Sequence, residues 1–412
     1  MAEKWAPTVV SHENLGYFQP TYNIVDQSER LAVWEDDASG YQECNELGRD
    51  INATVLVKWD NQLYHDENFR AMFTDNWDRV NGLPKNQVGR HRNQYFSGFI
   101  VRASLDTEHL DAQNADYVAA VSQPTGYSTC GNTVASAIGN QVVMSTLTDP
   151  GTPVHILDNP MFARLHDIDL HPDGTRLLTA SSSLDLLYEL DLEGNILWTM
   201  DLWEIDNVNQ RGQRFRRTIP EDPTSWLINP NPQELQNRPD YEGANCVLSD
   251  PEAYGRLGLP TGLIPVFVNS INYGYKPNEI LVTSFFKGEG WKINRATGQI
   301  DVVAKGMDRP HALRRDPLLG GYMVSDTGHE RVTFLSEDCT QEFTVDFANI
   351  TGHKAGLEKV RWLQYTTRLA DNTYCAILSS RQQIVLFDPL ARLKRTITFD
   401  PNWGLQLVSA NT

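Results

Sequence analysis

A unit of about forty residues recurs in the C-terminal part of the chain, and it constrains the fold more than any other feature. Its clearest copy spans residues 166–201, HDIDLHPDGTRLLTASSSLDLLYELDLEGNILWTMD. Apolar and polar residues alternate there between Asp-Gly, Ser-rich and Glu-Gly-Asn turns, a pattern typical of four short antiparallel strands. Further copies begin at Asn269, His311 and Gln364, and their second and third strands align in the same columns. Four strands in this length match one blade of a β-propeller.

The rest of the chain sets the number of blades. Residues 30–160 carry strand and turn signals for two more blades with long insertions, which gives six, with a seventh as the alternative. The C-terminal LQLVSANT is predicted to supply the strand that completes the last sheet. We therefore predict an all-β chain with an irregular segment over residues 1–30 and a single six-bladed propeller domain over residues 31–412.

A long segment over residues 203–265 interrupts the repeats. It is rich in Pro, Asn and Gly, but it also contains Trp203, Trp226, Tyr241 and Tyr254, which argue against simple disorder. We predict that it is an insertion folded over one face of the propeller. It is also the segment through which the chain would bind a protein partner.

Charge and hydropathy exclude several classes of partner. The formal net charge is -18, which disfavours nucleic acids and anionic membranes. No stretch of 18 apolar residues is present, so no membrane span is predicted. The N-terminus lacks the pattern of a signal peptide, which predicts a cytoplasmic protein, or a periplasmic one if a signal has been removed. Five scattered cysteines show no metal-ligand spacing.

The repeats place four polar residues at equivalent positions. His166, Asn269, His311 and Gln364 each open a predicted first strand, and first strands line the central channel of a propeller. All four side chains form hydrogen bonds, and the two histidines titrate near neutral pH. This ring predicts a small-molecule site at the channel mouth. The alternative is that the four residues cap strand ends.

The same stretches resemble the bacterial arylsulfate sulfotransferases, whose fold is a six-bladed propeller. The resemblance covers residues 160–400 and rests on His166-Asp167 with the Glu-Gly-Asn-x-x-Trp turn, on Asn269-Ser270, on Thr283-Ser284 and on His311-Ala312 followed by Asp326-Thr327-Gly328. It implies sulfuryl transfer between phenols through a sulfated histidine. By this resemblance His311 matches the nucleophile and His166 a sulfate-oxygen ligand.

The chain departs from that family at two positions. Phe267 stands where the family has a second histidine ligand, and Phe285 where it has an anion-binding arginine. Each lost donor to an anionic transition state costs roughly 3 kcal/mol or more. Arg381, Arg314 and Arg315 are candidate replacements, with surface or inter-blade ion pairs as the alternative.

These observations predict an enzyme that acts on a small aromatic or phenolic molecule by group transfer or lysis. His311 would be nucleophile or general base, with His166 as its polar partner. Asn269, Gln364, Phe267 and Phe285 would hold the substrate, with Arg314 and Arg381 as further binding residues. The first rival is a non-catalytic propeller that binds protein partners.

A metal-dependent, lactonase-like propeller is the second rival. No resident cofactor is predicted, but calcium is the alternative, because Asp167 and Asp169 lie on one face of a strand and Asp185 or Asp326 could join them. The other interpretation of Asp167 is that it accepts backbone hydrogen bonds between blades.

Overall fold

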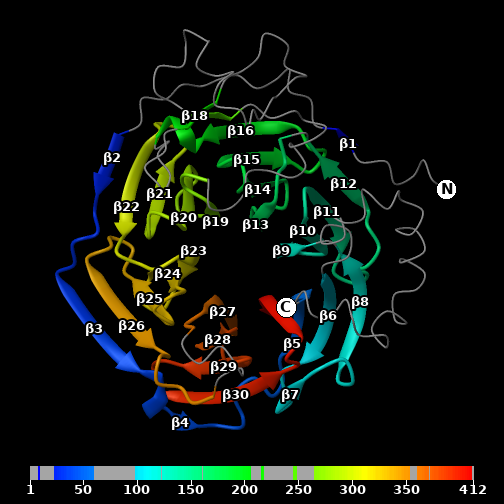
Figure 1. Cartoon of the computed structure of the whole chain (residues 1–412), viewed down its shortest axis with the longest axis vertical. Helices are drawn as coiled ribbons and strands as arrows, with labels where there is room; N and C mark the ends of the chain where they lie inside the picture. The colour runs from blue at the N-terminus through cyan, green and yellow to red at the C-terminus, as the bar shows by residue number, and fades with distance from the viewer. Residues whose placement is uncertain are drawn as a thin grey trace. The chain divides into compact units, whose positions relative to one another are not determined.

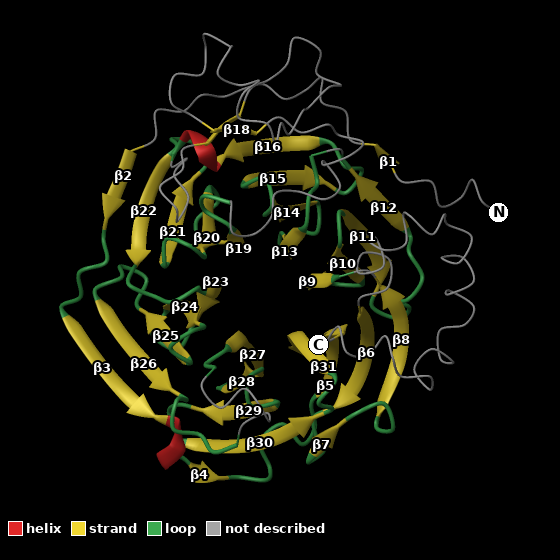
Figure 2. Ribbon diagram, viewed as in Figure 1, coloured by secondary structure: helices red, strands yellow, loops and turns green. Residues whose placement is uncertain are grey.

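The computed structural model confirms an all-β fold (Figure 1). It describes residues 8–9, 23–59, 98–121, 123–159, 161–205, 215–217, 245–247, 264–352, 360–370 and 372–410. Within these ranges there is no α-helix, and the helical residues are two short 3-10 turns, Ala38–Gly40 and Leu202–Glu204 (Figure 2). No described helix therefore has the length and hydropathy of a membrane span.

Apart from the two-stranded pair of β17 and β18, the described strands form six sheets, in the order expected of a six-bladed rather than a seven-bladed β-propeller. The chain also divides into two compact units. The first unit comprises Met1–Glu29, Ser128–Thr146 and Pro153–Arg315, and the second comprises Arg30–Tyr127, Leu147–Thr152 and Asp316–Thr412.

The sheets of the first unit are antiparallel meanders, with one short strand added in parallel to two of them. The first sheet contains β9 (Pro124–Cys130), β10 (Thr133–Ile138), β11 (Gln141–Thr146), β12 (His155–Asp158) and β1 (Thr8–Val9). The second contains β13 (Leu165–Leu170), β14 (Arg176–Ser181), β15 (Leu186–Asp191) and β16 (Ile196–Asp201). The third contains β19 (Val268–Tyr273), β20 (Glu279–Ser284), β21 (Glu289–Asn294), β22 (Gln299–Ala304) and β2 (Asn23–Asp26).

The remaining three sheets follow the same plan. The fourth contains β23 (His311–Asp316), β24 (Gly321–Asp326), β25 (Arg331–Leu335), β26 (Gln341–Asp346) and β3 (Ala32–Asp37). The fifth contains β27 (Leu363–Ala370), β28 (Thr373–Leu378), β29 (Gln383–Asp388), β30 (Leu393–Phe399) and β4 (Gln42–Glu43), with β7 (His109–Leu110) also paired to β30. The sixth contains β31 (Trp403–Ala410), β5 (Asn52–Trp59), β6 (Gly98–Ser104) and β8 (Ala115–Val121).

The segment 203–265, expected to be an insertion, is described at residues 203–205, 215–217, 245–247 and 264–265. In it β17 (Phe215–Arg217) pairs in parallel with β18 (Asn245–Val247). The predicted position of the insertion over one face lies outside the described residues.

The N-terminal strands pair with partners far away in sequence. β1, β2, β3 and β4 each add one strand, in parallel, to the last strand of a sheet formed much later in the chain. β3 lies in the range 30–160, where strand signals were expected, and its partner β26 begins some three hundred residues later. Two of the added strands, β1 and β2, fall in the segment that was expected to be irregular.

The C-terminal strand completes the sixth sheet, as predicted. β31 pairs antiparallel with β5, so the first position of this sheet comes from the end of the chain and the other three from its beginning. Leu405, Leu407 and Val408 of β31 are buried. This arrangement gives β5 a partner strand and places the two ends of the propeller sequence in one sheet.

Apolar faces of consecutive sheets make the core within each unit. In the first unit, β10 and β11 contribute to a cluster with β13, β14 and β15, and a second cluster joins β14 and β15 to β19, β20, β21 and β22. In the second unit, Phe334, Phe347, Tyr374 and Phe387 join the fourth and fifth sheets through edge-to-face and tilted ring contacts.

Truncation of β31 at its core should destabilise the protein. Leu405→Ala removes a fully buried side chain from the strand that completes the sixth sheet, so we expect the free energy of unfolding to fall by about 2–5 kcal/mol. Leu390→Ala, at a side chain that is 63% exposed, is the control and should change it by no more than about 0.5 kcal/mol. Equal effects of the two substitutions in chemical denaturation would contradict the assigned role of β31.

Candidate functional site

The four polar residues aligned by the repeats occupy irregular positions in the first strand of their sheets. The pairing of β13 shifts between Leu165 and Ile168, around His166, and that of β19 shifts around Asn269. The pairing of β27 shifts in the same way around Gln364. In β23, His311 precedes Ala312, whose φ is 56°. Bulges of this kind redirect side chains and recur beside functional sites.

A fifth residue of this set was missed from the sequence. Gln406 lies where the pairing of β31 shifts between Leu405 and Leu407, the same position in the sixth sheet. The alternation of apolar and polar residues in GLQLVS indicated a strand here. Gln406 was missed because this strand lacks the turn spacing by which the other repeats were aligned.

Hydrogen bonds fix the orientation and tautomer of His311. Its Nδ1 lies 3.0 Å from the carbonyl oxygen of Arg309, which only accepts, so Nδ1 carries a proton. Asn269 Nδ2 lies 2.9 Å from His311 Nε2 and, as an amide nitrogen, donates to it. Both side chains are buried. In this arrangement the Nδ1 proton of His311 is donated to Arg309, and its Nε2 accepts the amide N–H of Asn269.

The first unit brings His166 close to His311. Their ring centroids lie 6.1 Å apart. His166 comes from β13 and is half-buried, whereas His311 comes from β23 and is buried. The repeat alignment thus identified two imidazoles that lie side by side although 145 positions separate them in the sequence.

Phenyl rings surround the two imidazoles. The Phe267 centroid lies 5.5 Å from that of His166, and the Phe285 centroid lies 5.8 Å from that of His311. Phe267 and Phe285 contact each other edge to face at 5.2 Å, and Phe286 contacts both. The two positions that departed from the sulfotransferase pattern therefore make an apolar wall beside the histidines.

A buried carboxylate holds Phe267 in place. Asp185 accepts hydrogen bonds from the backbone N–H groups of Val266 at 2.9 Å and Phe267 at 2.7 Å, and from the indole N–H of Trp203 at 3.0 Å. Phe267 has a φ of 53°, a conformation that costs a non-glycine residue on the order of 1–3 kcal/mol. The bonds to Asp185 stabilise this backbone and so set the position of the ring.

Arg164 is a further residue at this cluster that sequence reasoning missed. Its guanidinium carbon lies 5.6 Å from the centre of the Phe267 ring. Burial lowers the pKa of Arg164 below its ordinary value, but an arginine remains charged at neutral pH. Its position two residues before His166 was the available signal. The cluster therefore combines two imidazoles, three phenyl rings and one cation.

Asp167 and Asp169 connect the first strands of neighbouring sheets. Asp167 accepts a hydrogen bond from the backbone N–H of Ile271 at 3.2 Å, and Asp169 accepts one from that of Tyr273 at 2.9 Å. This confirms the inter-blade interpretation of Asp167. Burial raises the pKa of Asp167 to about 7, and Arg314 offsets part of that effect.

The arginines proposed as replacements have different surroundings. The charge of Arg314 opposes the rise in the pKa values of Asp167 and Asp169 that burial causes. Arg315 is exposed, and its guanidinium carbon lies 5.9 Å from the centre of the Tyr275 ring. In the second unit, the buried Arg381 is paired with Glu330 at 2.6 Å and donates to the carbonyl oxygens of Ala348 and Ile350. This guanidinium is part of an inter-blade ion pair.

Gln364 also belongs to the second unit. Its side-chain oxygen accepts a hydrogen bond from the indole N–H of Trp362 at 2.7 Å, and its amide nitrogen lies 3.5 Å from Gln406 Oε1. A role of Gln364 in substrate binding stays a prediction.

The acidic residues considered for calcium make other contacts. The oxygens of Asp167, Asp169 and Asp185 accept N–H groups, as described above, and Asp326 lies 2.7 Å from His329 Nδ1. Across the described ranges, no three His, Cys, Asp or Glu side chains form a group suited to a metal ion. These contacts give the calcium interpretation no support.

The raised pKa of Asp167 predicts a pH-dependent stability. An unfolded aspartate has its pKa near 3.8, so between about pH 4 and pH 7 the folded protein binds a proton that the unfolded chain has lost. The free energy of unfolding should therefore fall as pH rises through this window, by at most about 1.4 kcal/mol per pH unit from this group. Asp167→Asn should flatten the profile, whereas Glu193→Gln, at an exposed acid of the same sheet, should not. Identical profiles for wild type and Asp167→Asn would contradict this.

The ion pair of Arg381 predicts a structural effect of its removal. Arg381→Leu leaves Glu330 buried without its counter-charge, so the free energy of unfolding should fall by about 3–5 kcal/mol. Arg392→Leu removes an exposed partner of Asp36 and should cost about 1 kcal/mol or less. A cost for Arg381→Leu no larger than that of the control, in urea denaturation, would contradict the ion-pair role.

Comparisons with known proteins identify the fold alone. No family model matches the chain, and no curated protein is similar in sequence. A chain from a structure described as "Crystal structure of Nidogen/Laminin Complex" is similar with a TM-score of 0.51 and 11% identity, covering 77% of this chain and 97% of that one. A protein of unknown function from Bacteroides caccae is similar with a TM-score of 0.48 and 12% identity, covering 76% of this chain and 94% of that one. At 11% identity, the likeness to the chain of the nidogen and laminin complex concerns the fold alone.

Proposed function

We propose that this protein is a propeller enzyme that binds a small aromatic molecule at the cluster of His166, His311, Phe267 and Phe285. The observation that carries the proposal is the geometry of His311. Its Nδ1–H is held by a backbone carbonyl, its Nε2 accepts the amide N–H of Asn269, and the ring lies beside a second imidazole. A histidine acting as base or nucleophile needs this tautomer and a fixed orientation.

His311 Nε2 would be the reacting atom of the enzyme. As a general base, Nε2 takes the proton of a phenolic hydroxyl. As a nucleophile, it takes a group from an aryl ester and releases the phenolate. Asn269 donates a hydrogen bond to Nε2 in this structure, so this bond has to break when substrate binds. In the proposed reaction the half-buried His166 donates to the leaving or accepting oxygen.

The remaining residues would select the substrate. The rings of Phe267, Phe285 and Phe286 offer edge-to-face contacts to an aromatic body. Arg164 adds a positive charge beside Phe267, which suits an anionic ester such as an aryl sulfate. The resemblance to the arylsulfate sulfotransferases supports this class of substrate, and Arg164 is our candidate for the cation missing at Phe285.

A protein-binding propeller is the second candidate. The similar chain in the nidogen and laminin complex comes from an assembly of two proteins, but the likeness covers the fold alone. The observation in this chain that favours the second candidate is a run of exposed apolar residues at the start of β3.

Binding and turnover of 4-nitrophenyl sulfate test the enzymatic proposal. We expect this ester and 4-nitrophenol to raise the melting temperature, and 4-nitrophenolate to be released in the presence of a second phenol as acceptor. His311→Gln should lower kcat by about a hundredfold or more, because it removes the base or nucleophile. Phe285→Ala should raise KM more than it lowers kcat.

The matched control is His109→Gln, at an exposed histidine of the second unit, which should leave turnover unchanged. The proposal is wrong if neither aromatic compound stabilises the protein, or if His311→Gln and His166→Gln turn over the ester as wild type does.

A further inference from the structure

Strand β3 ends the fourth sheet and leaves one backbone edge open. Its six residues pair in parallel with β26, from Ala32 opposite Gln341 to Asp37 opposite Asp346. No described strand pairs with the other edge (Figure 1). An open edge of this kind presents N–H and C=O groups that can pair with another extended chain.

The start of this strand exposes large apolar side chains. Leu31 is 89% exposed, Val33 56% and Trp34 41%. They are three of the ten large hydrophobic side chains that are exposed across the described ranges, and they lie within four consecutive residues. Single exposed apolar residues are common on protein surfaces, but a contiguous group beside an open edge indicates an interaction surface.

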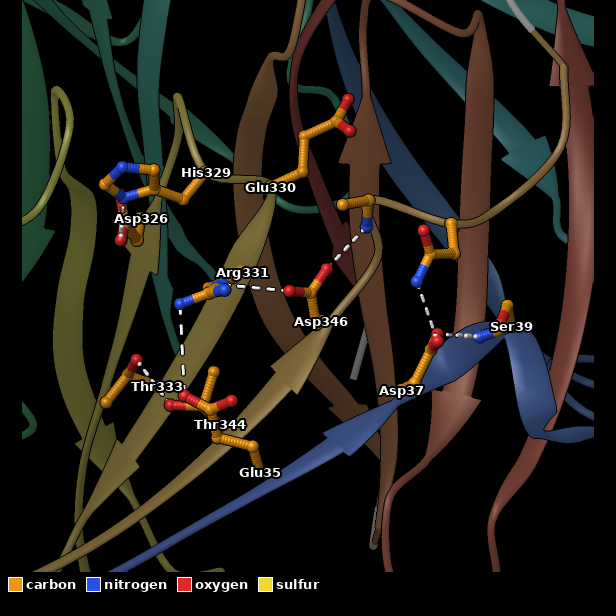
Figure 3. A network of polar contacts seen from close by, with 12 residues as sticks. Glu35, Asp37, Ser39, Asp326, His329, Glu330, Arg331, Thr333, Thr344 and Asp346 are labelled. Atoms are coloured by element: carbon orange, nitrogen blue, oxygen red, sulfur yellow. Dashed lines mark hydrogen bonds and ion pairs between the residues drawn. The ribbon is translucent and has the colours of Figure 1, made fainter.

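Side-chain contacts hold β3 in place as a fixed template. Arg331 pairs with Asp346 at 2.9 Å and reaches Glu35 at 3.9 Å, and Asp37 accepts a hydrogen bond from Asn349 Nδ2 at 2.8 Å (Figure 3). Trp34 stacks on Phe343 with ring centroids 5.9 Å apart. A partner that binds the open edge would therefore not have to order this strand.

Three of the usual protections of an edge strand, namely lysine, proline and a bulge, are missing from β3. Residues 31–37 contain no lysine and no proline, and the pairing with β26 shows no bulge. Proteins commonly use these features to prevent strand addition. The outer edges of this fold also accept strands as a rule, since β1, β2 and β4 pair with the last strands of three other sheets in the way that β3 pairs with β26.

Charge determines which partner fits. Asp36 is paired with Arg392 and Asp37 with Asn349, whereas the side chain of Glu35 is 60% exposed and has only the 3.9 Å contact with Arg331. The whole chain carries a formal charge of -18, which opposes the approach of a second copy. A basic segment of another protein is therefore the occupant that the surface favours.

We propose that the outer edge of β3 binds an extended basic segment of a partner protein by strand addition. The partner strand pairs with the backbone of residues 31–37. It places an apolar side chain beside Leu31 and Val33 and a lysine or arginine beside Glu35. This surface belongs to the second unit and is independent of the enzymatic proposal for the first.

The experiment uses a fluorescent peptide of about eight residues that carries two valines and one lysine at alternate positions, hence on one face of the strand, with threonine on the other face. Two comparison peptides carry glutamate in place of the lysine, or proline in place of the valines. We expect the valine–lysine peptide to bind the full chain at least tenfold more tightly than either comparison peptide. Val33→Lys and Glu35→Lys should each weaken binding about tenfold or more, and Leu390→Lys, the same change at another exposed apolar residue, should not.

Hydrogen exchange and oligomeric state decide between the remaining outcomes. Added protection of the amides of residues 31–37 by the peptide supports strand addition, provided that all variants keep the wild-type melting temperature. Absence of binding, or binding unaffected by Val33→Lys, overturns the proposal. A concentration-dependent dimer that Val33→Lys dissolves would identify a second copy as the occupant and overturn the charge argument.

Discussion

The candidate site depends on one buried carboxylate. Asp185, at the turn between β14 and β15, accepts the N–H groups of Val266 and Phe267 where the chain enters the next sheet. Glu330 occupies the same turn of the fourth sheet and accepts the N–H of Trp362 at 3.2 Å. Both acids have a positive φ, 51° and 55°. The fold thus repeats an inter-blade bond, and in the first unit that bond positions the phenyl wall.

The repeats predicted the part of the structure that local pattern determines. Alternating strands and Asp-Gly turns gave the all-β class, the meanders and the equivalent placement of His166, Asn269 and Gln364. The bulge positions were not predicted from the sequence, because a bulge changes the pairing of a strand without giving a distinct local pattern. The alignment of the repeats alone placed His166 and His311 at equivalent positions. Their ring centroids lie 6.1 Å apart, which agrees with that alignment.

Long-range pairing could not be predicted in the same way. Nothing in RLAVWEDD indicates that β3 joins a strand some three hundred residues later, because the partner contributes backbone rather than a sequence motif. Arg381 was predicted to bind substrate, with an inter-blade ion pair as the alternative, and in the structure it pairs with Glu330. Arg164 was overlooked because its significance depends on Phe267, a hundred residues away.

Nitrogen NMR of the histidine side chains tests the central claim most directly. With ¹⁵N-labelled imidazoles, the account predicts that His311 is a neutral Nδ1–H tautomer and that 4-nitrophenol shifts its Nε2 resonance together with that of His166. A His311 that carries its proton on Nε2, or imidazole resonances that do not respond to the phenol while His109 serves as an unaffected reference, would contradict it.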